Sequence, residues 1–228
     1  MPYEIRISVK KLAEFLLQSG SLDNRFGGVD RASEGARIHR RLQKEGGESY
    51  QAEVFLSQQT ERNGFLYRVE GRADGVITSA GGVTIDEIKT TAAPFSMLTE
   101  DFNHAHWGQA MCYAHFYCKQ QGITQISVQL TYFQVDTEEI RRFRRLYTAE
   151  ELETFYLHLL DQYEKWAVIQ RDWGRIRDAT IRAMPFPFAE YRSGQRKLRF
   201  IAPLWQRDGF FVKLPQGLAK RFQHYFQR

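Results

Sequence analysis

Hydrophobic and polar residues alternate along two arms, residues 70–79 and 82–91, on either side of the turn signal Ser-Ala-Gly-Gly. A period of two around a glycine-rich turn predicts a β-hairpin. With a two- or four-residue loop, the register places Asp74 opposite Glu87. Because side chains alternate between faces, we expect one face to carry Asp74, Val76, Ile85, Glu87 and Lys89, and the other to carry Ile77, Asp86 and Ile88.

The rest of the pattern predicts helices and strands in mixed order. Apolar stripes predict helices after the N-cap Ser8, ending at Gly20, and over residues 31–44. Alternation over 50–56 and 65–69, around a polar turn at 58–64, predicts strands that lead into the hairpin as an antiparallel meander. We further expect a helix over 104–121, strands over 123–135 and 140–147, and a long helix opened by the capping box Thr148–Glu151. The fold class is α/β, with a central mixed sheet and helices on both faces.

Length and composition favour one main domain with a basic extension. A chain of 228 residues with 43% hydrophobic content can bury one substantial core. The run Met184–Phe188, with two prolines, ends the last helix, so we place a domain over residues 1–183 and a tail over 184–228. The tail holds nine Lys or Arg against two acids, which suits either a polyanionic partner or a solvated extension.

Targeting and cysteine signals are weak in this sequence. It shows no leading signal peptide and no apolar run long enough to span a bilayer, so we expect a soluble, cytoplasmic protein without a membrane partner. Cys112 and Cys118 are too few for a disulfide scaffold. Together with His104 and His106 they fit no standard zinc spacing, so we assign them no metal.

The predicted hairpin brings two carboxylates and an ammonium group together. Directly opposed Cβ atoms lie roughly 4.5 to 5.5 Å apart, so Asp74 and Glu87 repel each other unless a cation lies between them or one is protonated. Oxygen ligands of this kind suit Mg²⁺ or Mn²⁺. Lys89 can hold or deprotonate a water molecule, or stabilise charge on a phosphorane-like transition state. An exposed hairpin with a surface ion pair is the alternative interpretation of this stretch alone.

The segments Gly71–Ile77 and Ile85–Thr90 resemble the core of PD-(D/E)XK nucleases, in particular the RecB-like branch that includes CRISPR-associated exonucleases. Asp74 matches the first motif of that core, and Glu87 and Lys89 match the second. The resemblance implies a restriction-endonuclease-like core. In such a core Asp74, Glu87 and the main-chain carbonyl of Ile88 hold the metal, while Lys89 assists the attacking water.

Two further segments resemble RecB-like motifs. Gly35-x-x-x-His39 matches a motif whose histidine points at the metal, and Gly35 is expected to let its helix approach the sheet closely. Gln109 and Tyr113, four apart on one helical face, match a pair that lines the site. An amide and a phenol can contact phosphate or order a water without adding charge. Taken without the resemblance, His39 and Gln109 are surface residues and Tyr113 is a core residue.

The resemblance implies a divalent-metal-dependent deoxyribonuclease, an exonuclease acting on single strands or ends of DNA in repair or recombination. Its implied catalytic residues are Asp74, Glu87, Lys89, Gln109 and Tyr113, and its metal-site residues are His39, Asp74, Glu87 and Ile88. One alternative is a non-catalytic nucleic-acid-binding module that retains the nuclease fold and serves a helicase. Another is a structural interaction domain. Many RecB-like relatives carry a four-cysteine iron–sulfur cluster, and two cysteines cannot supply it, so we expect no cluster.

The tail carries a second resemblance. Residues 186–195 resemble the segment that opens the ATPase lobe of XPD/DinG-type helicases, which implies a helicase in cis or in trans as a partner. A phosphate-binding loop follows in that family, but residues 213–221 lack its Gly-Lys-Ser/Thr ending, so we expect no ATP binding.

Two groups of arginines stay open to two interpretations. Arg37, Arg40 and Arg41 are either phosphate contacts or a solvated helix face. The arginines at 141, 142, 144 and 145 either protect an edge strand by their charge or form a track for phosphates.

Overall fold

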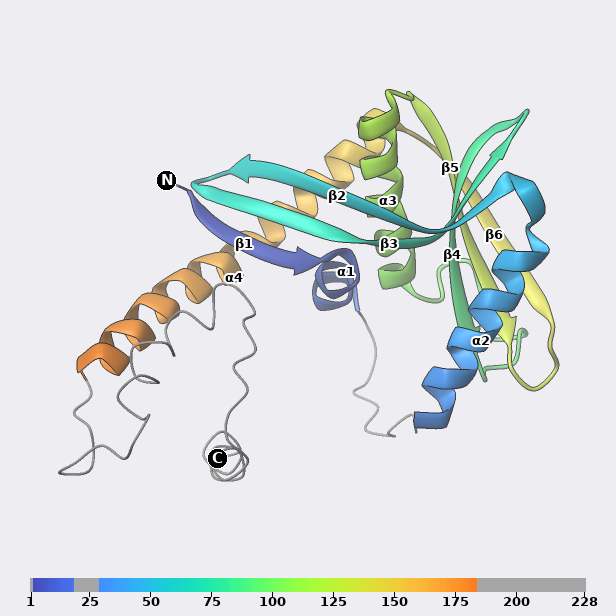
Figure 1. Ribbon diagram of the computed structural model, residues 1–228, viewed down its shortest axis with the longest axis horizontal. Helices are drawn as coiled ribbons and strands as arrows, with labels where there is room; N and C mark the ends of the chain where they lie inside the picture. Colours follow the sequence, from blue (N-terminus) through green and yellow to red (C-terminus); the bar gives the residue numbers. More distant parts are fainter. Residues whose placement is uncertain (1, 19–28, 184–228) are drawn as a thin grey trace, which may run out of the picture. The chain divides into compact units, whose positions relative to one another are not determined.

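The computed structural model of the protein describes residues 2–18 and 29–183 (Figure 1). In chain order the elements are β1 (Tyr3–Ser8), α1 (Val9–Leu17), α2 (Val29–Glu45), the short 3-10 helix η1 (Gly47–Ser49), β2 (Tyr50–Arg62), β3 (Phe65–Ser79), β4 (Gly82–Thr91), α3 (His104–Gln121), β5 (Gln125–Gln134), β6 (Ile140–Thr148) and α4 (Ala149–Ala183). The predicted tail and its helicase-like segment lie outside the described residues. The boundary after residue 183 therefore stays a prediction.

Within the described residues, six strands form one mixed sheet in the order β1-β3-β4-β5-β6, with β2 paired to β3. The strand β3 is antiparallel to β2 and β4, which confirms the predicted meander (Figure 1). It is also parallel to β1, a pairing that the sequence pattern did not indicate. The strand β4 is parallel to β5, which in turn is antiparallel to β6. The hairpin strands thus lie in the interior of the sheet.

Helices cover both faces of the sheet, as predicted. On one face, α1, α3 and the first part of α4 pack on the larger core, in which Leu12, Phe116 and Leu159 contribute large buried side chains. On the other face, α2 contributes Ile38 and Leu42 to a smaller core with Ile88 and Phe133. The α/β class is therefore confirmed. No helix in residues 2–18 or 29–183 has both the length and the apolar character that a membrane crossing requires.

The chain divides into two units, Met1–Arg171 and Asp172–Arg228, and α4 runs from the first into the second. In the described part of the second unit, the guanidinium of Arg177 stacks on the ring of Trp173 and pairs with Asp178. Trp173 and Ile176 are exposed there.

The predicted strands before the hairpin are too short. Residues 58–62, expected as a turn, belong to β2. The chain turns instead at Asn63 and Gly64, which both have positive φ values, of 50° and 79°. The glycine accepts this conformation without strain. The two strands are therefore paired from Arg62 opposite Phe65 to Tyr50 opposite Ile77, and their length carries β2 as far as the hairpin.

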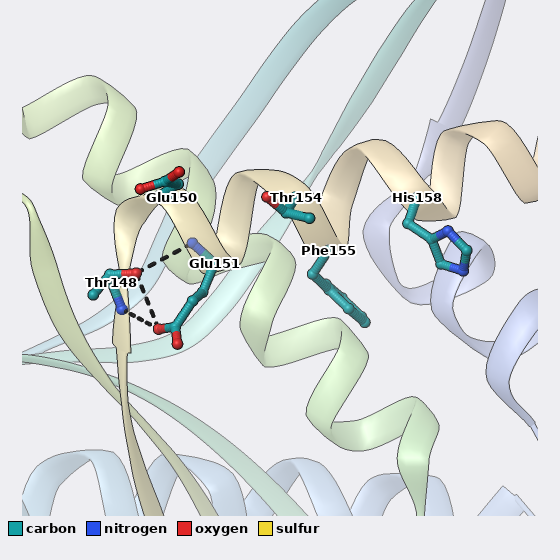
Figure 2. Close-up of a pocket in the computed structure, with 6 residues that line it drawn as sticks. All are labelled: Thr148, Glu150, Glu151, Thr154, Phe155 and His158. Carbon is teal, nitrogen blue, oxygen red and sulfur yellow. Dashed lines mark hydrogen bonds between the residues drawn. The ribbon is translucent and has the colours of Figure 1, made fainter.

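Helix ends follow the local signals closely. Ser8 caps α1 by accepting a hydrogen bond from Lys11 N at 3.2 Å, although the helix ends at Leu17 rather than at Gly20. The helix α3 ends at Gly122 with φ 67°, as predicted. Thr148 and Glu151 form the predicted capping box at the start of α4: Thr148 Oγ1 accepts from Glu151 N at 3.2 Å, and Glu151 Oε2 accepts from Thr148 N at 2.8 Å (Figure 2). The pocket in Figure 2 contains none of the predicted site residues.

The strand β6 lies at the end of the strand order, as the edge-strand interpretation requires. Three of its arginines donate hydrogen bonds within the protein. Arg141 reaches the carbonyls of Phe95 and Leu98, Arg144 reaches Gln129 Oε1, and Arg145 reaches Glu100 and Asp101. These contacts favour a structural role for the arginines over a phosphate track.

Candidate active site

The strands β3 and β4 separate at the predicted site. Their ladder runs from Ser79 opposite Gly82 to Gly75 opposite Asp86, which is the register that the hairpin predicted. Asp74 is the next residue, at the point where the strands part. Its Oδ2 accepts a hydrogen bond from the main-chain N–H of Ile88 at 2.8 Å. The carboxylate of Asp74 therefore continues the contact between the two strands where the ladder stops.

The face assignment of Asp74 needs a correction. Ala73 and Val76 are three positions apart, yet both pack in the larger core. Strict alternation would put them on opposite faces, so the alternation of β3 shifts by one residue across Asp74 and Gly75. As a result Asp74 reaches toward α2, where its Oδ1 lies 3.2 Å from His39 Nδ1.

His39 reaches Asp74 because of the residues beside it on α2. Ile38 and Leu42 hold the helix against Ile88, and His39 lies on the flank of that buried stripe. Gly35 lies close to β4, but the approach of the helix leaves room for a Cβ at this position. A Cβ added at Gly35 would lie 3.6 Å from Thr90 Oγ1, which is an ordinary contact.

Glu87 and Lys89 lie together on the α3 side of β4. Glu87 is only 1% exposed, and its Oε1 accepts a hydrogen bond from Lys89 Nζ at 2.6 Å. Burial and the nearby charge of Asp74 raise the pKa of Glu87 to about 8, against the opposing effect of the ammonium. Burial lowers the pKa of Lys89, but the carboxylate of Glu87 more than reverses this, so the pKa lies above its ordinary value. Lys89 is therefore an ammonium at neutral pH.

The second carboxylate oxygen of Glu87, Oε2, is buried and has no hydrogen-bond partner among the described residues. Leaving such an acceptor unpaired costs about 1–3 kcal/mol, and more for a charged group. A hard divalent cation is the kind of partner that an unpaired carboxylate oxygen binds well, and the charge of Asp74 is near enough to act on Glu87. Glu87 Oε2 and Asp74 therefore fit a metal ion chemically.

The same residues do not form a complete ligand set. Across residues 2–18 and 29–183, no three His, Cys, Asp or Glu side chains gather in a way that could hold a metal ion. An ion bound by Asp74 and Glu87 would therefore need further oxygen ligands from main chain, water or substrate, as Mg²⁺ commonly does. The main-chain carbonyl of Ile88 is the predicted third ligand, and that role stays a prediction.

Gln109 and Tyr113 of α3 line the site on the side where Glu87 and Lys89 lie. Both are buried, and Gln109 Oε1 accepts a second hydrogen bond from Lys89 Nζ at 3.2 Å. The hydroxyl of Tyr113 bonds with Gln109, and burial together with the charge of Glu87 raises the pKa of Tyr113. Gly71 of β3 leaves the space for that hydroxyl, because a Cβ there would lie 2.5 Å from it.

Two further side chains near the site were missed by the sequence reasoning. Gln43 Nε2 donates to the main-chain carbonyl of Asp74 at 3.0 Å. Its position four residues after His39 on the same helix face was the signal that could have found it. His106, three residues before Gln109, has its Nδ1 2.8 Å from Tyr132 Oη. Burial, with the charge of Lys89, lowers the pKa of His106 to about 3, so this ring is neutral.

The opposite face of β4 holds a second buried carboxylate, that of Asp86. It accepts hydrogen bonds from Tyr50 Oη at 3.0 Å, from Thr131 Oγ1 at 2.6 Å and from Gln129 Nε2 at 3.0 Å. Gly75 makes room for the ring of Tyr50, since a Cβ there would lie 2.0 Å from the ring. The sequence predicted the face of Asp86 but not this network.

The chain is similar to a known family of proteins. Residues 10–192 match the family described as the PD-(D/E)XK nuclease superfamily. No curated protein matches the chain at a significant level of similarity.

Several solved structures are similar to the chain at low identity. An alkaline exonuclease from Laribacter hongkongensis is 13% identical with a TM-score of 0.42, over 75% of this chain and 94% of that one. A phage related exonuclease from Haemophilus somnus 129PT is 14% identical with a TM-score of 0.43, over 74% of this chain and 97% of that one. The Laribacter enzyme in complex with dAMP matches at 14% identity and a TM-score of 0.42, over 75% and 94% of the two chains.

Proposed function

Because the chain belongs to the PD-(D/E)XK nuclease superfamily and has its restriction-endonuclease-like α/β core, we propose that it is a nuclease that hydrolyses phosphodiester bonds in DNA with the help of Mg²⁺ or Mn²⁺. The single observation that carries this proposal is the unpaired, buried Oε2 of Glu87 beside Lys89 and within the electrostatic reach of Asp74. A purely structural ion pair would have no reason to leave that acceptor open.

The two carboxylates are the proposed ligands of the cation, with the Ile88 carbonyl as a third and His39 nearby. His39 orients the carboxylate of Asp74 through Oδ1, while Ile88 N–H holds Oδ2. The cation, when bound, supplies positive charge to the scissile phosphate and lowers the pKa of a water. Its charge also favours the ionised form of Glu87, whose pKa is otherwise raised to about 8.

Lys89 is proposed to stabilise the charge that develops on the phosphate. Because its pKa is raised, it acts as a hydrogen-bond donor rather than as a base. Its Nζ is held by Glu87 and Gln109 at 2.6 and 3.2 Å, so the ammonium is already oriented. A donor fixed in this way costs no reorganisation when the substrate reacts. Gln109 and Tyr113 complete this arrangement and position the scissile phosphate without adding charge.

The RecB-like motif order supports a finer proposal, that the protein is an exonuclease acting on single strands or ends during DNA repair or recombination. A helicase, in cis or in trans, is the partner proposed from the resemblance of the tail. The proposed cofactor is Mg²⁺ or Mn²⁺. The proposal includes neither an iron–sulfur cluster nor ATP.

The test is to incubate end-labelled single- and double-stranded DNA with the wild-type protein and Mg²⁺ or Mn²⁺, beside the Lys89→Ala and Asp74→Asn variants. We expect metal-dependent cleavage by the wild type and a loss of about a hundredfold or more in Lys89→Ala. Equal cleavage by the wild type and Lys89→Ala would reject the role of Lys89. Salt-sensitive DNA binding without cleavage in either metal would favour the non-catalytic module instead.

A further inference from the structure

Gln43 makes two contacts at the back of the proposed site. It lies on α2 and is 9% exposed. Its Nε2 donates to the main-chain carbonyl of Asp74 at 3.0 Å and to Glu53 Oε1 at 3.2 Å. One side-chain amide thus joins three elements, the helix that carries His39 and the strands β2 and β3.

The partner of Gln43 on β2 has an unusual backbone conformation. Glu53 has a φ of 54°, in the left-handed region, which costs a residue other than glycine about 1–3 kcal/mol. The β2–β3 ladder pairs Ala52 with Gly75 and Val54 with Ala73, and passes over the pair between them, Glu53 and Asp74. The main chain of Asp74 therefore lacks support from β2 at this position, and Gln43 supplies a donor to its carbonyl instead.

We propose that Gln43 is a positioning residue of this site, which fixes the main chain of Asp74 so that its carboxylate keeps its contacts with Ile88 N–H and His39. The carboxylate needs this support because it lies where three strands lose their regular pairing. Among the described residues, Gln43 donates to the main-chain carbonyl of Asp74 and to Glu53, so its effect on the site passes through Asp74. An effect of Gln43 on cleavage rests on the proposed function, whereas an effect of Gln43 on the position of the Asp74 carboxylate does not.

The structural consequence is tested without metal or substrate. Amide hydrogen exchange is measured at Ile88, whose N–H reports the position of the Asp74 carboxylate. In Gln43→Met, which keeps the shape but has no donor, we expect exchange at Ile88 to rise about fivefold, as the loss of about 1 kcal/mol of hydrogen bonding implies. Unchanged exchange at Ile88 overturns the proposal. If the methionine variant does not fold, Gln43→Glu retains the shape and, when ionised, also lacks the donor.

Two matched variants separate positioning from general destabilisation. Gln134 is also a buried glutamine, with hydrogen bonds to Asp136 and Thr137, away from Asp74. Gln134→Met should leave exchange at Ile88 within about twofold of the wild type. Glu53→Gly removes the carboxylate, tolerates the positive φ and keeps the contact between Gln43 and Asp74, so it should do the same. Equal increases in all three variants would contradict a specific role for Gln43.

The catalytic consequence is tested by Mn²⁺ titration and by steady-state cleavage. In Gln43→Met we expect the Mn²⁺ concentration for half-maximal activity to rise, or kcat to fall, about 10- to 100-fold, as for residues that orient metal ligands. The KM for DNA should change little. If the wild type cleaves no DNA in any metal while Ile88 responds to Gln43→Met, the proposed function fails and the positioning role stands. If the wild type cleaves DNA and Gln43→Met has the same cleavage rate and the same Mn²⁺ dependence, the positioning role is overturned and the proposed function stands.

Discussion

Asp86 and Glu87 are neighbours in β4, and both are almost fully buried, with 4% and 1% exposure. On one face Asp86 accepts hydrogen bonds from three donors, a phenol, a hydroxyl and an amide. On the other face Glu87 has one donor, Lys89, and an oxygen with no partner among the described residues. Two carboxylates one residue apart therefore have opposite hydrogen-bond states.

Under the proposed function, this difference separates a structural carboxylate, Asp86, from a metal-binding one, Glu87. Buried polar groups are normally satisfied, and Asp86 follows that rule. Glu87 departs from it and lies beside Lys89, which also contacts Gln109. A satisfied carboxylate contributes to the stability of the sheet, while an unsatisfied one destabilises the metal-free protein and is, in the proposed function, a ligand for the cation. The predictions below test this division between the two faces of β4.

The largest expected difference is in DNA cleavage. Glu87→Gln keeps the shape but removes a proposed metal ligand, so cleavage should fall about a thousandfold, the loss of several kcal/mol of transition-state stabilisation. Asp86→Asn should stay within about fivefold of the wild type per folded molecule. Cleavage rates are measured with Mg²⁺ on labelled DNA, and folded fractions by circular dichroism. A comparable loss in both variants would remove the functional distinction between the two carboxylates.

The second difference between the two faces is in stability, and here substitution of Asp86 is expected to have the larger unfavourable effect. Asp86→Ala leaves the donors of Tyr50, Thr131 and Gln129 without their acceptor, so we expect a loss of about 3 kcal/mol in the free energy of unfolding. The measurement is the midpoint of urea denaturation in EDTA, with the slope unchanged. Thr131→Val, which removes one of the three donors, should cost about 1 kcal/mol. If Asp86→Ala is as stable as the wild type, the network does not support the sheet.

The buried pair on the other face should be replaceable with a gain in stability. In the metal-free protein at pH 9, above the pKa of about 8 at which Glu87 ionises, we expect the double variant Glu87→Gln/Lys89→Met to be about 2 kcal/mol more stable than the wild type, because a buried ion pair rarely repays its desolvation. The single variant Lys89→Met should instead be destabilised, since it leaves Glu87 buried without its cation. Urea denaturation in EDTA measures both. A double variant less stable than the wild type would mean that the pair is structural.

The pair of Glu87 and Lys89 also predicts how the stability of the protein depends on pH. The pKa of Glu87 is raised from 4.5 to about 8 by burial, so between these values the folded state binds more protons than the unfolded state. The metal-free protein should therefore lose stability as the pH rises from 4.5 to 8, by at most about 1.4 kcal/mol per pH unit from this group. The double variant should lack this component, and saturating Mn²⁺ should reduce it. A rise in stability over that range, due to Glu87, would contradict the raised pKa.

Much of this arrangement could be predicted from the sequence, because it depends on short-range rules. Alternation and the glycine turn gave the hairpin register, and helical spacing put Gln109 and Tyr113 on one face. The shift in alternation at Asp74 could not be predicted, since it arises where β3 leaves β4 and where Glu53 interrupts the pairing with β2. The Asp86 network was missed for a similar reason. Its donors come from β2 and β5, and only the sheet order brings them together.

The smallest expected effects come from one hydroxyl on each face. Tyr50 and Tyr113 each lie over a glycine of β3, Gly75 and Gly71, which leaves room for the phenol. Tyr50→Phe removes a donor to Asp86, so it should cost about 1 kcal/mol of stability and leave cleavage unchanged. Tyr113→Phe should leave stability nearly unchanged and lower cleavage about tenfold, because its hydroxyl belongs to the group around Lys89 and Gln109. Urea denaturation and cleavage assays on the two variants give four values. Since the chemical change is identical, an exchange of the two outcomes would mean that the faces of β4 have been assigned the wrong way round.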